Sequence, residues 1–132
     1  QAAYWVDEMP RDFRIDYPGS VPKYRTEIKR LGLEYMQTYE EVKTEKFTPD
    51  YFMGRFAEAV RVAEERNVPM YCGEYGVINL ASAENTLNWY KDISSAFEKC
   101  SIGRAAWSYK DVDYGFIDGH LDSVLDELVK YL

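Results

Sequence analysis

Apolar side chains recur at helical spacing between residues 48 and 67. The expected stripe is Phe52, Phe56, Val60 and Ala63. Thr48 is a good N-cap, Pro49 suits the first helical position, and Asn67 can end a helix in a left-handed conformation. We therefore expect a helix that begins after Thr48 and ends at Asn67.

The spacing changes at Val68, where an apolar run begins that is too short for a helix. Residues 68–73 are typical of a buried strand of a parallel sheet. The strand leads into Glu74, which stands between Gly73 and Gly76. A carboxylate at the carboxyl end of a parallel strand faces the side where α/β folds carry their chemistry, and glycines allow a ligand to come close. The alternative is a strand-end Glu that caps the next loop.

Helical spacing returns over residues 83–99, after Ser82 as N-cap, with a stripe of Leu87, Tyr90, Ile93 and Phe97. A second strand is expected over residues 104–109, then an Asp- and Gly-rich loop to Gly119. A last helix is expected over residues 120–132, with one apolar face formed by Leu121, Val124, Leu125, Leu128 and Leu132. This βαβα order requires a parallel sheet with helices packed on it and right-handed crossovers.

Two parallel strands cannot by themselves bury both faces and both edges. A (β/α)8 barrel needs ~250 residues, about twice the 132 residues present. The expected fold class is therefore α/β, the C-terminal portion of a (β/α)8 TIM barrel, with the last two βα units, the preceding helix and a long loop. Residues 1–132 would form one segment of a single barrel domain. Residues 1–47 show no clean period and would be a loop region, with a helix from Pro22 to Arg30 that ends at Gly32. The start at Gln1, in an aromatic-rich stretch, is typical of the inside of a longer protein.

Composition narrows the classes of partner. The net charge of −7 and the interspersed cations argue against nucleic acid, and no apolar run is long enough to cross a membrane. Twelve Tyr and three Trp suit a sugar-binding cleft. The alternative is that these aromatic residues, most of the Tyr included, pack in the core. Cys72 and Cys100 are expected to be buried free thiols, with a disulfide between them as the alternative that their spacing does not indicate. One His and two Cys argue against a structural zinc site, and no metal or other cofactor is implied.

Two motifs together resemble the C-terminal part of glycoside hydrolase family 5, the cellulase-type family of (β/α)8 barrels. The first is Tyr71-Cys72-Gly73-Glu74-Tyr75-Gly76, and the second, about thirty residues later, runs from Ile102 to Phe116 through Ala106-Trp107-Ser108. The opening Gln1-Ala2-Ala3-Tyr4-Trp5 resembles the loop after that family's sixth strand. The resemblance covers nearly the whole chain.

The resemblance implies roles for matching residues only. Glu74 matches the catalytic nucleophile at the end of the seventh strand, and Trp107 matches the aromatic platform at the end of the eighth. Trp5, Lys110 and Asp111 are weaker candidates for substrate contacts, since loop packing explains Trp5 equally well and a solvated surface pair is the commoner fate of Lys110 and Asp111. The implied activity is that of a retaining endo-β-1,4-glucanase acting on a β-linked polysaccharide or oligosaccharide. Mannan and xylan remain open as substrates, and the resemblance favours an extracellular or cell-surface parent protein.

The sequence departs from the family in the second carboxylate. Family members carry an acid/base in an Asn-Glu pair at the fourth strand, together with an Arg and several His residues from earlier strands. No Asn-Glu pair occurs in this chain, and its single histidine, His120, lies beyond the eighth strand. Asp111, Asp113 and Asp118 are the nearest substitutes, although a turn or loop-ordering set explains them better. We therefore expect the isolated chain to be inactive or nearly so. The alternatives are a non-catalytic carbohydrate-binding module, and a barrel fragment that associates with itself or with the missing half of the barrel.

Overall fold

The computed structural model describes residues 7–19, 21–34 and 46–132. The chain divides into two compact units, Gln1–Phe47 and Thr48–Leu132, and each is described by itself. Trp5 and Ser20 lie outside the described residues. Within the described ranges, no helix is both long and apolar enough to cross a membrane.

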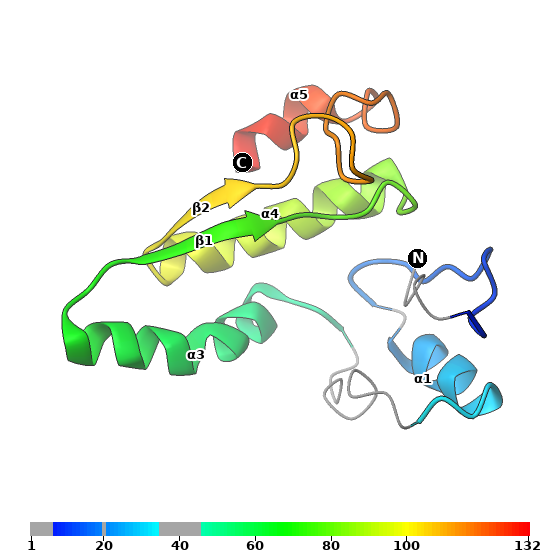
Figure 1. Cartoon of the computed structure of the whole chain (residues 1–132), viewed down its shortest axis with the longest axis horizontal. Coiled ribbons are helices and arrows are strands. Elements are labelled where there is room, and N and C mark those ends of the chain that lie inside the picture. The colour runs from blue at the N-terminus through cyan, green and yellow to red at the C-terminus, as the bar shows by residue number, and fades with distance from the viewer. Residues whose placement is uncertain (1–6, 20, 35–45) are drawn as a thin grey trace. The chain divides into compact units, whose positions relative to one another are not determined.

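The first unit is built on α1, Val21–Arg30 (Figure 1). Its helix bounds agree with the expectation, and Gly32 follows with a φ of 69°, which a glycine adopts without steric cost. One face of the helix is buried against the preceding loop and the following turn. The buried apolar cluster consists of Met9, Tyr24, Ile28 and Leu33.

The second unit runs in the expected order of helix, strand, helix, strand and helix (Figure 1). Its elements are α3 (Pro49–Arg66), β1 (Met70–Tyr75), α4 (Ala83–Lys99), β2 (Ile102–Ala106), α5 (Leu125–Leu128) and a final 3-10 turn, η1 (Val129–Tyr131).

Both long helices carry the caps that the sequence predicts. The Thr48 hydroxyl accepts a hydrogen bond from the amide of Tyr51 at 3.3 Å, and the Ser82 hydroxyl accepts one from Asn85 at 3.2 Å. Asn67 ends α3 in the left-handed region, at φ 51° and ψ 49°. These caps set where each helix begins and where the chain turns toward the sheet.

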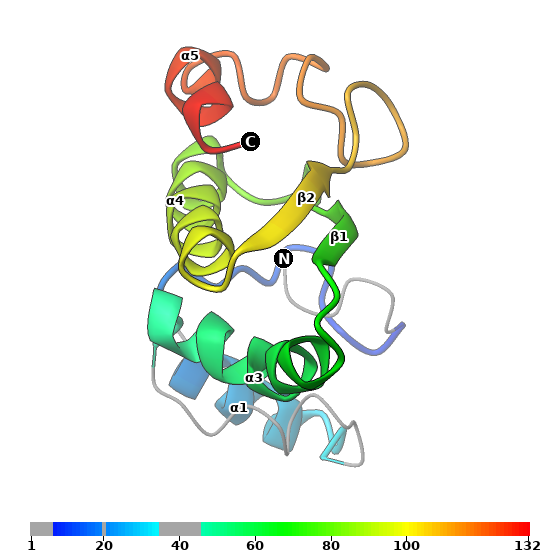
Figure 2. The same cartoon turned by 90° about the vertical axis from the view of Figure 1, so that its left-hand side faces the viewer.

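The two strands pair in parallel, with Met70 opposite Ile102 and Cys72 opposite Arg104. Both arrowheads in Figure 1 point the same way, so the segments after the two strands leave the sheet at the same end. Figure 2 shows that α4, which connects β1 to β2, covers one side of the pair. The sheet therefore has the βαβ arrangement that the alternation of patterns predicts.

The core lies between α4 and the sheet, where aromatic rings dominate. Tyr90, Ile93 and Phe97 of the predicted α4 stripe are buried. Tyr75 reaches into this cluster from the end of β1, and its ring lies 5.0 Å from that of Phe97 and 5.6 Å from that of Tyr90, between centroids. Burial raises the pKa of the Tyr75 and Tyr90 phenols, so both remain neutral at physiological pH. Ile102, Phe116, Leu121 and Leu128 complete the cluster.

The expectation of a strand buried on both faces was wrong. Residues alternate between half-buried and exposed positions at the start of β1, and Tyr71 is 68% exposed. Only one face of the two-stranded sheet is packed against helices, and in a closed barrel further strands would cover the other face. β1 also extends to Tyr75, so Glu74 belongs to the strand and does not follow it, and β2 spans Ile102–Ala106, earlier than expected.

The last helix is shorter than its apolar pattern predicts. Residues 120–124 form turns. The Asp122 amide donates to the Gly119 carbonyl oxygen at 3.3 Å and the Val124 amide donates to the Leu121 carbonyl oxygen at 2.9 Å, so each bond spans three residues and not the four of an α-helix. Val124 has φ −128°, which is outside the helical region, so regular helix starts only at Leu125. Leu121 and Leu128 are nonetheless both buried, because turns can point apolar side chains at the core as a helix does.

Candidate active site

Glu74 lies in a β-bulge of β1. Between the paired positions Cys72–Arg104 and Tyr75–Ala106, β1 advances three residues while β2 advances two. The extra residue breaks the alternation of faces, and Gly73 and Glu74 are both exposed while Tyr75 is buried. A bulge of this kind bends the strand locally and changes the direction in which a side chain points. The Glu74 carboxylate therefore leaves the sheet on its open side while its neighbour Tyr75 anchors the strand in the core.

Trp107 follows β2 directly and is tied to the same point of β1. Its amide donates a hydrogen bond to the carbonyl oxygen of Tyr75 at 2.8 Å, and its peptide bond to Ser108 is cis. The indole is 43% exposed, which is unusual for so large an apolar side chain. Tyr75, the residue after Glu74, and Trp107, in the middle of the second motif, are thus held together by one backbone hydrogen bond.

A shallow hollow of about 300 Å³ opens at this end of the sheet. The residues that line it are Glu74, Tyr75, Gly76, Trp107 and Tyr114. The Glu74 carboxylate, the Trp107 indole and the half-buried Tyr114 ring offer a charged oxygen and flat apolar surfaces to a ligand, whereas the Tyr75 ring is buried in the core. This combination suits a sugar, whose CH groups contact rings while its hydroxyls bond to polar groups.

Gly76 permits the close approach of the two strand ends. A Cβ at this position would lie 2.3 Å from the carbonyl oxygen of Trp107 and 3.2 Å from Cδ1 of Tyr114. The nearer contact is with backbone, which cannot move aside without displacing Trp107. The second glycine of the motif is therefore required by space, as the close approach expected from the sequence implies.

The loop after Trp107 is folded back on itself by its own polar groups. The Ser108 hydroxyl donates to the carbonyl oxygens of Lys110 at 3.2 Å and Asp111 at 2.9 Å, and the Asp118 carboxylate accepts from the Asp111 amide at 2.9 Å. Asp111, Val112 and Asp113 all have φ between 50° and 65°, so three successive residues turn in the left-handed region. Asp118 thus helps to order the loop. The sequence favours this structural role for the Asp-rich segment over a role as acid/base.

The predicted site residues fall into three groups. Glu74 and Trp107, at the ends of neighbouring strands, share the hollow. Lys110 and Asp111 are exposed in the loop and are not among the lining residues, and Trp5 lies outside the described residues. The roles of these residues in catalysis or binding stay predictions. Tyr114 lines the hollow and was missed, because an aromatic residue inside an Asp–Gly loop carries no periodic signal.

Cys72 and Cys100 are free thiols, as expected, although both are half-buried and neither is fully enclosed. The Cys72 thiol lies 3.3 Å from the carbonyl oxygen of Glu74 and so contacts the bulge from the packed side. No group of three or more His, Cys, Asp or Glu side chains suited to a metal ion occurs in the part of the chain that the structure describes.

No family model matches the chain. Endoglucanase C of Acetivibrio thermocellus is 28% identical to it over 134 residues, a match that covers 100% of this chain and 38% of the endoglucanase. Cellodextrinase A of Ruminococcus flavefaciens is 46% identical over 54 residues, which make up 41% of this chain and 16% of the cellodextrinase. The chain therefore spans about two fifths of the length of the curated endoglucanase it matches.

Solved structures with a similar fold include a cellulase and a cellulose synthase subunit. Cel5A of Thermotoga maritima, in complex with a mannotriose substrate, matches with a TM-score of 0.53 and 19% identity over 94% of this chain and 41% of that one. The cellulose synthase subunit Z of Clostridioides difficile matches with a TM-score of 0.52 and 23% identity over 74% of this chain and 35% of the subunit. The resemblance that the two motifs indicate is thus confirmed: the chain is similar in sequence to cellulase-type enzymes, and its fold is a portion of a (β/α)8 barrel.

Proposed function

We propose that this chain is the nucleophile-bearing part of a retaining glycoside hydrolase that acts on a β-1,4-linked glucan. Glu74 is the nucleophile and Trp107 is the platform beneath the sugar that is cleaved. The observation that carries the proposal is that a bulge aims Glu74 into the hollow that Trp107 also lines, at the carboxyl ends of two parallel strands. This is the end of a (β/α)8 barrel where catalytic side chains gather.

The proposed reaction is a double displacement. A carboxylate oxygen of Glu74 forms a bond to the anomeric carbon while the bond from that carbon to the glycosidic oxygen breaks. The leaving oxygen takes a proton from an acid. A water molecule then gives its proton to the same group, now a base, and attacks the anomeric carbon, which releases the sugar and restores the Glu74 carboxylate. The exposed Trp107 indole offers a flat apolar face against which a pyranose ring can stack.

The acid/base of this reaction must come from a second carboxyl group about 5–5.5 Å from the first. Glu74 is the only carboxylate among the described residues that line the hollow. In the neighbouring loop, the Asp118 carboxylate is engaged by the Asp111 amide. We therefore propose that the isolated chain has little or no turnover on an unactivated glucan, since the leaving oxygen would depart unprotonated.

Relatives guide the choice of substrate. Their names include an endoglucanase and a cellodextrinase, and the structural neighbours include complexes with cellobiose and with mannotriose. A β-1,4-glucan is therefore the first substrate to test and a β-mannan the second. The open face of the sheet, where Tyr71 is 68% exposed, supports pairing with the rest of a barrel or with another copy of the chain.

The test is release of reducing ends from a soluble β-1,4-glucan by the folded 132-residue chain, by Glu74→Gln and by Glu64→Gln. Glu64 is an exposed carboxylate on α3. Glu64→Gln is therefore the control for Glu74→Gln, because it removes the same charge with the same change of side-chain shape. We expect no turnover from any of the three. Turnover that only Glu74→Gln abolishes would support the nucleophile and contradict the proposed inactivity, because some second carboxyl group would then complete the site.

Binding distinguishes the proposal from a non-catalytic sugar-binding module. Trp107 would serve both functions, whereas only the enzyme needs a carboxylate in the bulge. Glucan binding that is unchanged in Glu74→Ala and lost in Trp107→Ala, with no covalent chemistry at Glu74, would favour the binding module.

A further inference from the structure

We propose that Tyr114 is a second aromatic contact for the sugar, in the same hollow as Trp107, and that the loop after β2 holds it there. The inference rests on the proposed function and adds a substrate-contacting residue to it. Tyr114 lines the hollow together with Glu74 and Trp107, and its side chain is half-buried, so part of the ring is open to a ligand.

The backbone around Tyr114 is fixed on both sides. Its carbonyl oxygen accepts from the amide of Ser108 at 3.3 Å, and the preceding carbonyl, of Asp113, accepts from the amide of Asn79 at 2.7 Å. Asn79 belongs to the segment after β1 and Ser108 to the segment after β2. The loop therefore bridges the ends of both strands, and Tyr114 sits at the point where it does so.

The Tyr114 ring lies close to Gly76, the residue that directly follows β1. Its Cδ1 atom lies 3.2 Å from the position of a Cβ on Gly76, two residues beyond Glu74. Any larger residue at Gly76 would therefore press on both Tyr114 and Trp107. The glycine and the loop together place a tyrosine where a sugar bound over Glu74 would meet it.

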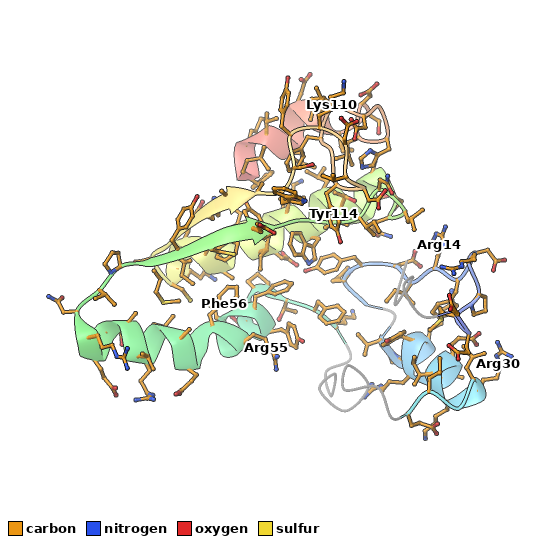
Figure 3. The ribbon with its side chains drawn as sticks, viewed as in Figure 1. Arg14, Arg30, Arg55, Phe56, Lys110 and Tyr114 are labelled. Carbon is orange, nitrogen blue, oxygen red and sulfur yellow. The ribbon has the colours of Figure 1, made fainter. Side chains whose placement is uncertain are left out.

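Chemistry also favours a role in sugar binding. A tyrosine ring can stack on the CH face of a pyranose, and its hydroxyl can bond to a sugar hydroxyl. Tyr109 provides a contrast in the same loop, since it is 74% exposed and is not among the residues that line the hollow. In the view of Figure 3, Lys110 lies toward the top of the loop and Tyr114 lies below it. The loop thus presents one tyrosine to the hollow and leaves the other in solvent.

The test is calorimetric titration of the folded chain with cellotetraose, compared among Tyr114→Ala, Tyr114→Phe, Tyr109→Ala and Trp107→Ala. We expect Tyr114→Ala to weaken binding by about three- to tenfold, the range of a single aromatic contact, and Tyr114→Phe to retain most of the affinity. Tyr109→Ala should bind as the unaltered chain does. Because Tyr114→Ala can loosen the loop, nuclear Overhauser effects from cellotetraose protons to the Tyr114 ring are measured in the unaltered chain as well.

The outcomes separate the two proposals. Normal binding by Tyr114→Ala, or Overhauser effects to Trp107 without any to Tyr114, would overturn the role of Tyr114 and leave the proposed function standing. Binding that is absent, or that is unaffected by Trp107→Ala, would overturn the proposed function and this inference with it. A similar loss in Tyr109→Ala and Tyr114→Ala would also overturn the inference, because the effect would then belong to the loop as a whole.

Discussion

Replacing Gly76 with alanine tests the geometry on which the site depends. The new methyl group would lie 2.3 Å from the Trp107 carbonyl oxygen, whereas ordinary contacts begin at 3.4 Å. The backbone at Trp107 must therefore move by about 1 Å, since no side-chain rotation can relieve a contact with a backbone oxygen. That movement also strains the 2.8 Å hydrogen bond between the Trp107 amide and the Tyr75 carbonyl oxygen.

The cost can be worked from these two contacts. Overpacking of one methyl group costs about 1–3 kcal/mol, and a weakened backbone hydrogen bond adds about 1 kcal/mol. The lower entropy of the unfolded alanine chain offsets about 0.4–1 kcal/mol of this. A net loss of about 2 kcal/mol lowers Tm by about 10 °C in a unit of this size.

Gly54→Ala is the matched control. Gly54 is exposed within α3, with nothing within 4 Å of an added Cβ, so alanine should stabilise the helix by about 0.5–1 kcal/mol. Thermal unfolding followed by circular dichroism measures both variants. A Gly76→Ala chain as stable as the unaltered one would refute the close approach of the strand ends, and with it the placement of Trp107 beside Glu74.

Three further predictions concern the caps, the loop and a surface charge. Thr48→Ala removes the hydroxyl that caps α3 and should cost about 1 kcal/mol in urea unfolding; an unchanged midpoint would argue against the cap. Asp118→Ala removes the acceptor of the Asp111 amide at 2.9 Å, so hydrogen exchange of that amide should accelerate while amides of α4 stay protected. Hydrogen bonds, above all from Lys130, lower the pKa of Glu127 from 4.5 to about 2. Because this pKa is depressed in the folded state, the stabilisation is present above pH 4.5 and is lost as pH falls toward 2; Glu127→Gln should flatten the acid limb of a stability–pH curve, and an identical limb would contradict the assignment.

The sequence specified the elements whose signals are local. Thr48, Asn67 and Ser82 marked helix ends correctly, because a cap depends on one side chain and the few amides next to it. The parallel pairing of the two strands also followed, since a helix between two strands leaves few alternatives. Glu74 and Trp107 line the same hollow. The sequence indicated this proximity, because it placed both residues at the carboxyl ends of adjacent parallel strands.

Features that depend on pairing across the sheet could not be read from the sequence. The bulge at Glu74 is a difference in residue count between two strands, which neither strand reveals alone. The turns at residues 120–124 replace a helix although the apolar spacing is the same, because Leu121 can reach the core from either conformation. The loop that carries Tyr114 is held by hydrogen bonds from the Ser108 amide to the Tyr114 carbonyl oxygen and from the Asn79 amide to the Asp113 carbonyl oxygen, which are contacts between separate segments of the chain.

Covalent trapping tests the central claim most directly. A 2-deoxy-2-fluoro-cellobiosyl fluoride has a leaving group that departs without help from an acid, so a nucleophile alone should suffice to form the glycosyl-enzyme. Mass spectrometry of the folded chain after incubation should then show one adduct, on the peptide that contains Glu74, and none in Glu74→Gln. An adduct that persists in Glu74→Gln, or no adduct in a chain that binds cellotetraose, would contradict the assignment of Glu74 as the nucleophile.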